Sequence, residues 1–207
     1  MNQPLIRELI EIAVEQESKH GRLNTVLRQR LPELESALVL PADAPVAALV
    51  RFVTRYIRSV PSCLRLVTAV SKRQGFFEYA APFIRLAEDY FLQPPDEVGK
   101  SEGLEALLDE AFLAHRLLEE VNDSHIKHLQ RPLLPFDMTE ANIIVHHLIG
   151  DDLATRLEQL VDYTASGLLR HERAWQTVKA GATSGYPELK RQELAPQLEE
   201  IRLRLAS

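Results

Sequence analysis

Apolar residues recur every three or four positions along most of the chain, which is the spacing of one face of an α-helix. This pattern, with many Leu, Ala, Glu and Arg residues, predicts helices and almost no strands. Prolines and glycines divide the pattern into segments. The predicted helices cover 4–20, a short stretch after Asn24, 46–59, 61–73, 76–92, 101–129, 139–149, 152–180 and a last segment that restarts near Pro196.

The segments predict an all-α fold, a single-domain helical bundle of seven or eight helices over residues 1–207. A candidate domain boundary lies near 93–100, where two prolines stop a helix, but both sides have the same helical pattern. The longest run without a charged residue, 141–150, has ten residues. A membrane span needs about 20, so we expect no membrane partner. The single Cys63 and the charged N-terminus favour a cytoplasmic protein.

Histidines fall on the apolar faces of several predicted helices when these are placed on a helical wheel. In 101–129, His115 and His125 lie inside the apolar arc and Glu119 lies at its edge. Five of the seven histidines face the interior by this interpretation: His20, His115, His125, His147 and His171.

Neutral imidazoles and carboxylates that face the axis of a helical bundle can bind a transition metal such as iron. His115 and Glu119, four positions apart, predict two metal ligands on one helix face, which His147 or His171 would complete. A redox-active metal here predicts an oxygen-dependent oxidase or a sensor. The alternatives are a polar pocket for another small ligand, or histidines that only pack in the core with their ring nitrogens bonded to protein groups.

The polar pocket is predicted from residues that share faces with these histidines. Asn122 lies on the face of His115 and Glu119. Gly167 points inward in 152–180 and would let another helix or a ligand come close. Glu88 and Tyr163 complete the predicted pocket.

Two residue pairs, His115-x-x-x-Glu119 and His147-x-x-x-x-Asp152, resemble ligand pairs of hemerythrin-like proteins. The His-x-x-x-His pair that those proteins carry between them is missing, because His125 and His128 are three positions apart. The resemblance covers two short motifs, and we infer no membership of that family from it.

The chain has 24 Lys and Arg against 30 Asp and Glu, a net charge of −6, which argues against a nucleic-acid partner. Residues 44–77 nevertheless contain no Asp or Glu. Within them Arg51, Arg55 and Arg58 share one helix face, which we expect to be exposed to solvent. This basic face, within 51–73, predicts the alternative function of a non-enzymatic adaptor or regulatory protein, or a homo-oligomer held by charge.

Overall fold

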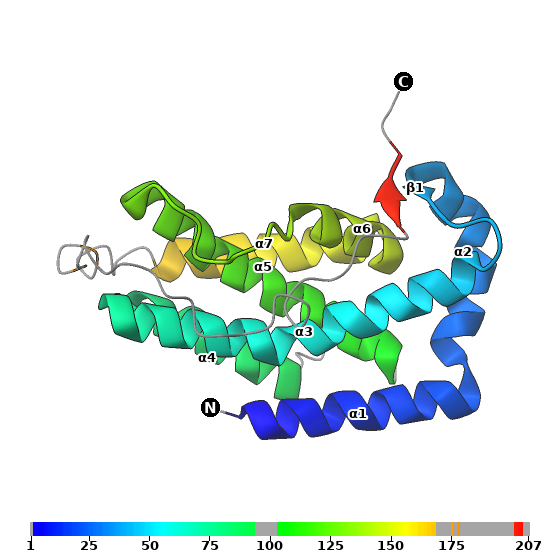
Figure 1. The fold of residues 1–207 in the computed structure, drawn as a ribbon, viewed down its shortest axis with the longest axis horizontal. Helices are drawn as coiled ribbons and strands as arrows, with labels where there is room; N and C mark the ends of the chain where they lie inside the picture. Colours follow the sequence, from blue (N-terminus) through cyan, green and yellow to red (C-terminus); the bar gives the residue numbers. More distant parts are fainter. Residues whose placement is uncertain (1, 94–102, 169–174, 176–177, 179–200, 205–207) are drawn as a thin grey trace.

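The computed structural model describes residues 2–93, 103–168, 175, 178 and 201–204, in which seven α-helices and one pair of short strands are present (Figure 1). This architecture confirms the predicted all-α fold. The candidate boundary and the predicted helix beyond residue 168, with His171, lie outside the described residues apart from Gln93, Trp175 and Val178. The elements are α1 (Gln3–His20), α2 (Arg22–Ala37), β1 (Leu38–Val39), α3 (Pro45–Gln74), α4 (Phe77–Leu92), α5 (Leu104–Leu129), α6 (Thr139–Ile149), α7 (Asp151–Leu168) and β2 (Arg202–Leu203).

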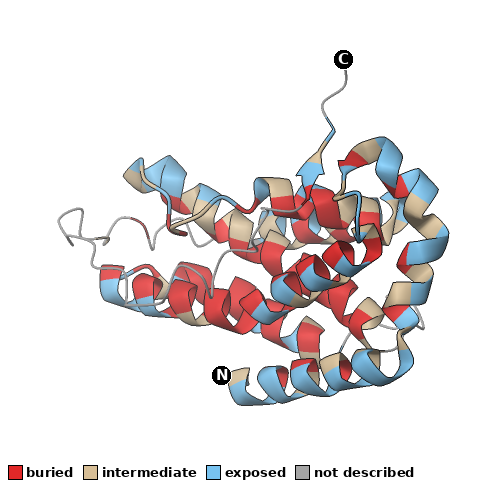
Figure 2. Ribbon diagram, turned by 45° about the vertical axis from the view of Figure 1, so that its right-hand side comes forward, coloured by how far each residue is buried: buried red, intermediate tan, exposed pale blue. Residues whose placement is uncertain are grey.

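Three helices, α3, α4 and α5, pack against one another and form the centre of the molecule (Figure 2). The largest fully buried side chains belong mostly to them, including Phe52, Tyr56 and Phe112. In Figure 1, α1 lies along one side of this layer, α6 and α7 lie along the opposite side, and α2 stands at one end. None of the described helices is both long and apolar enough to cross a membrane.

The helix ends follow local signals in the sequence. Gly21 ends α1 and Gly75 ends α3, with φ of 60° and 88°, a left-handed conformation that favours glycine. The Glu17 carboxylate accepts the backbone N–H groups of Leu23 and Asn24 at 2.9 and 3.0 Å and so caps the start of α2.

Two of the prolines that divide the sequence pattern lie inside helices, Pro32 in α2 and Pro61 in α3. The predicted helices 46–59 and 61–73 are therefore one helix of 30 residues, α3. Proline removes one backbone hydrogen bond, but residues of α3 on both sides of Pro61 are buried, and α3 packs against α4 and α5. Tertiary packing of this kind outweighs the local preference.

The buried face of α1 differs from the predicted one. Ile6 and Ile10 are buried, whereas Leu5 and Ile12 are 49% and 47% exposed, and His20 is exposed rather than interior. Residues 5–13 carry two overlapping apolar stripes, so helical periodicity cannot say which of them the bundle covers.

The described C-terminal residues return to the bundle at two places. Trp175 stacks between the rings of Phe76 and His128, with centroids 4.8 and 4.6 Å away. β2 pairs antiparallel with β1, so that Leu203 lies opposite Leu38. Neither contact was predicted from the sequence.

Candidate ligand-binding site

His115 lies in the core between α3 and α5, where it is 2% exposed. Its Nε2 atom lies 3.0 Å from Ser59 Oγ and 3.2 Å from the carbonyl oxygen of Tyr56. The Ser59 hydroxyl itself donates to that carbonyl at 2.7 Å, so the arrangement fits a neutral imidazole whose Nε2–H donates to both oxygens. Burial lowers the pKa of His115 to about 4, which keeps the ring neutral at pH 7.

Glu119, one turn further along α5, belongs to a hydrogen-bond network that joins three helices. The Tyr56 hydroxyl of α3 donates to Asn142 Oδ1 of α6 at 2.8 Å, and Asn142 Nδ2 donates to Glu119 Oε2 at 2.8 Å. Arg116 donates to the same carboxylate oxygen. The other oxygen, Glu119 Oε1, accepts no hydrogen bond within the described residues, and the side chain is 15% exposed. The network therefore holds the carboxylate in place and leaves one oxygen unused.

A groove of about 800 Å³ opens beside Glu119, between α5 and the segment 130–138. Asn122 holds that segment, because its Oδ1 accepts the backbone N–H groups of Leu133 and Leu134 at 2.9 and 3.1 Å. Among the described residues, the groove is lined by six apolar residues, three carboxylates, Asn122 and Thr139, and none of these is basic. The apolar and acidic members are Ile126, Pro132, Leu134, Pro135, Phe136, Met138, Glu119, Asp123 and Asp137.

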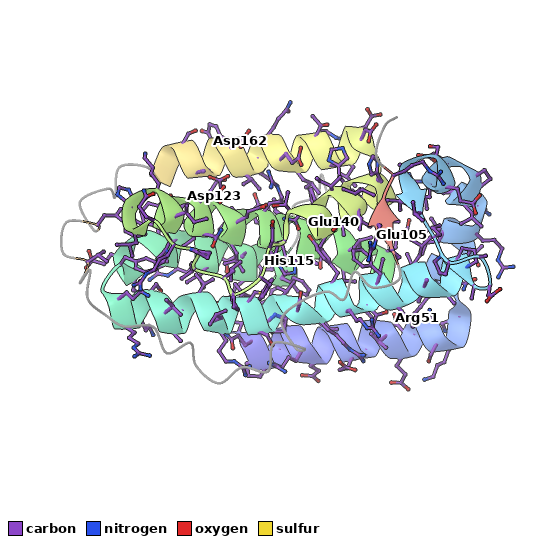
Figure 3. The ribbon with its side chains drawn as sticks, turned by 45° about the horizontal axis from the view of Figure 1, so that its top comes forward. Arg51, Glu105, His115, Asp123, Glu140 and Asp162 are labelled. Atoms are coloured by element: carbon purple, nitrogen blue, oxygen red, sulfur yellow. The ribbon has the colours of Figure 1, made fainter. Side chains whose placement is uncertain are left out.

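A smaller cavity of about 320 Å³ lies next to the groove, and Thr139 lines both. In Figure 3, His115 and Asp123 mark α5, and Glu140 marks the neighbouring α6. The rest of the smaller cavity's lining comes from α5, α6 and α7: Arg116, Asn142, Ile143, His146, His147 and Glu158. In this cavity the Glu158 carboxylate lies close to two nitrogen atoms: its Oε1 is 3.4 Å from His146 Nδ1 and 3.9 Å from Arg116 Nε.

The residues predicted to bind a metal lie in three different surroundings. His115 is hydrogen-bonded in the core, Glu119 borders the groove, and His147 is half-buried at the smaller cavity. Within the described part of the chain, no three His, Cys, Asp or Glu side chains gather in a way that could hold a metal ion. His171, the fourth predicted ligand, lies outside that part, so the set of four stays a prediction.

The predicted pocket residues also separate. Asn122 lines the groove, and Glu88 is buried on α4, 6% exposed, with Oε1 unpaired in the described structure. Tyr163 is 81% exposed, and Gly167 has open space where a side chain would lie. Neither Tyr163 nor Gly167 therefore lines an interior pocket as predicted. The buried face of α7 is Ala154, Leu157 and Val161, roughly opposite to both of them on the helix.

The predicted basic face is exposed, since Arg51, Arg55 and Arg58 all lie at the surface of α3. Arg58 forms a two-pronged ion pair with Glu11 of α1, at 2.9 and 2.6 Å. Part of the positive charge on this face is therefore neutralised within the chain.

Sequence reasoning missed Arg116, Asn142 and the segment 130–138. Asn142 did carry a signal, because it is the one amide within the otherwise apolar run 141–145. Arg116 carried none, since the helical wheel places it on the solvated side of its helix. Comparison of the chain with protein-family models, with curated proteins and with solved structures finds no match.

Proposed function

We propose that the protein binds a small organic ammonium compound with an apolar body, in the groove between α5 and the segment 130–138. The observation that carries the proposal is the combination, in one groove of about 800 Å³, of an apolar lining with three carboxylates and, among the described residues, no basic side chain. The volume is in the usual range for small-molecule sites, and such sites pair apolar walls with a few fixed polar groups.

The apolar body of the ligand is matched by Leu134, Phe136 and Met138. Leu134 and Met138 are buried and give the groove a fixed wall, while Phe136 is half-buried and keeps part of its surface open. An aromatic ring also attracts a cation that lies over its face.

The ammonium group is matched by Glu119. Its carboxylate is held by Arg116 and Asn142, so little conformational freedom is lost when a ligand donates to Oε1. Asp123 and Asp137 add negative potential along the same groove and favour a cation over an anion. This proposal takes the small-ligand alternative of the sequence analysis. The metal alternative is tested separately by metal analysis and a visible spectrum of the purified protein.

The experiment is a calorimetric titration of the full chain with phenethylammonium and, separately, with hydrocinnamate, an anion of similar size. We expect the cation to bind and the anion not to bind. Glu119→Gln should weaken binding of the cation about tenfold or more, because a charge-assisted hydrogen bond is lost. The control is Glu120→Gln, since Glu120 is the next residue on α5 and lines neither cavity.

Phe136→Ala is a second variant, and it leaves the hydrogen-bond network around Glu119 intact. It should also weaken binding of phenethylammonium, because it removes apolar contact with the ligand. Equal binding of the two probes, or no binding of phenethylammonium, would contradict the proposal.

A further inference from the structure

We infer that the ligand is an α-amino acid with a large apolar side chain, whose carboxylate enters the smaller cavity. This inference rests on the proposed function and adds the second charged group of the ligand. It assigns one group to each place: the ammonium to Glu119 Oε1, the side chain to the groove, and the carboxylate to Arg116.

The two cavities share one lining residue, and hydrogen bonds connect other residues of their linings. Thr139 lines both of them, and Glu119 of the groove is hydrogen-bonded at 2.8 Å to Asn142 of the smaller cavity. Arg116, also of the smaller cavity, donates to the same carboxylate. A ligand whose ammonium binds Glu119 therefore has its neighbouring atoms at the entrance to the smaller cavity.

Arg116 retains hydrogen-bonding capacity on the side of the smaller cavity. Nη1 donates to Glu119, and Nε is buried and donates to no acceptor in the described structure. The Arg116 side chain is 28% exposed and lines the smaller cavity, so the N–H groups at Nη2 are the donors that a ligand there would use. The nearest carboxylate across the cavity, Glu158, lies 3.9 Å from Nε, which is too long for a hydrogen bond. A guanidinium group matches the planar geometry of a carboxylate. The imidazole of His147 lines the same cavity and adds further ring nitrogens, whereas the ring nitrogens of His146 lie 3.4 Å from Glu158 and 3.3 Å from Asp151.

The spacing of the charges selects the class of amino acid. Arg116 and Glu119 are three positions apart on one helix face and contact each other directly. A ligand that uses both must carry its own two charges equally close together. An α-amino acid does so, because its ammonium and carboxylate are attached to one carbon, whereas a ligand with the charges at opposite ends of a chain does not. The groove, with its six apolar residues, then receives a large apolar side chain.

The test compares three probes on the unmodified full chain by calorimetric titration: L-phenylalanine, phenethylamine and L-phenylalaninamide. The second lacks only the carboxylate, and the third replaces it by a neutral amide. We expect phenylalanine to bind about tenfold more tightly than phenethylamine. The affinity of phenylalaninamide should be closer to that of phenethylamine than to that of phenylalanine. This comparison needs no variant and so does not depend on whether a variant folds.

A variant then assigns the carboxylate to Arg116. Arg116→Gln, which removes the cation but keeps a donor toward Glu119, should lower the ratio of the phenylalanine affinity to the phenethylamine affinity from about tenfold to about one, because only phenylalanine carries the carboxylate. Arg156→Gln is the matched control, because Arg156 is exposed on α7 and lines neither cavity. Equal binding of phenylalanine and phenethylamine to the parent would overturn the inference and leave the proposed function standing. Equal loss of both probes in Arg116→Gln would overturn the assignment to Arg116, and failure of every probe to bind the parent would overturn the proposed function itself.

Discussion

Two successive turns of α5 place polar side chains in opposite situations. At the first turn, His115 is 2% exposed and its Nε2 is bonded to Ser59 and to the Tyr56 carbonyl of α3. At the second turn, Glu119 borders a groove and keeps Oε1 unpaired within the described residues. The two residues lie on the same side of α5 on a helical wheel. Their surroundings therefore decide which one is structural and which one is available to a ligand.

The difference comes from what packs against each turn. A helix, α3, covers His115 and brings hydroxyl and carbonyl groups within hydrogen-bond distance. The irregular segment 130–138 lies over the following turns and leaves space between itself and α5. Buried polar groups that are fully paired specify packing, whereas a fixed group with a free acceptor beside a cavity can recognise a ligand.

The largest expected effect is on stability at the first turn. His115→Ala should lower the free energy of unfolding by about 4 kcal/mol, because it leaves a cavity and removes the donor to Ser59 and the Tyr56 carbonyl. Urea denaturation followed by circular dichroism measures this change. The affinity for phenethylammonium should stay within about twofold of the parent, provided that the titration is done where the variant is folded.

For Glu119→Gln we expect the opposite pattern. The affinity for phenethylammonium should fall about tenfold or more, and the free energy of unfolding should fall by less than in His115→Ala. If His115→Ala instead abolished binding while keeping the parent's stability, the roles assigned to the two turns would have to be exchanged.

A third part of α5 sharpens the contrast, because it buries two carboxyl groups that line neither of the two cavities described above. Asp109 and Glu110 are 5% and 6% exposed, and Glu110 Oε2 is unpaired in the described structure. Burial, with the nearby Glu105, raises the pKa of Asp109 to about 7. Burial, with the neighbouring Asp109, raises the pKa of Glu110 to about 8. Both groups therefore bind protons more tightly in the folded chain than in the unfolded chain.

The consequence is that the contribution of these two groups to stability falls with rising pH. Between their ordinary carboxyl values of 3.8 and 4.5 and the raised values near 7 and 8, the two groups hold more protons in the folded state, so their contribution to the free energy of unfolding decreases as pH rises and levels off above about 8. Glu110→Gln should stabilise the protein by about 2 kcal/mol at pH 8.5 and by much less at pH 4. Urea denaturation at the two pH values measures the difference, and the exposed Glu8→Gln serves as control. A Glu110→Gln effect of the same size at both pH values would show that the carboxyl is not protonated in the folded chain.

Much of the fold was predictable because helical periodicity and glycine stops are local signals. The ends of α1, α3 and α6 at Gly21, Gly75 and Gly150 follow the sequence directly. Pro32 and Pro61 misled the prediction, because whether a proline breaks a helix depends on packing by other helices. The same is true of the faces of α1 and α7, whose rotation is set by the rest of the bundle.

The candidate site was predictable only in part. The wheel brought Glu119 and Asn122 to one side of α5, and both line the groove. It could not predict that Asn142 of α6 would hold Glu119, or that Arg116 would turn toward α7. The groove wall, 130–138, has no periodicity from which a position could be predicted. A site formed between a helix and an irregular segment depends on tertiary packing. Only the residues on its helical side can be predicted from local periodicity.

The smallest expected effect concerns the exposed basic face of α3, which belongs neither to the hydrogen-bonded core around His115 nor to the groove. Arg51, Arg55 and Arg58 are exposed, and the pair between Arg58 and Glu11 lies at the surface with side chains 45% and 61% exposed. An exposed ion pair contributes about 0.5 kcal/mol, so replacing all three arginines with glutamine should change the free energy of unfolding by less than about 1 kcal/mol. We expect the field of the three charges to act on a partner instead, because the chain as a whole carries −6 and an acidic surface of a second copy would attract it. We therefore expect the parent to show a larger mass by light scattering at low ionic strength than at high ionic strength, and the triple variant to show no such difference, since salt screens exposed charges. An unchanged mass for both proteins at both salt concentrations would leave these arginines as an ordinary solvated face.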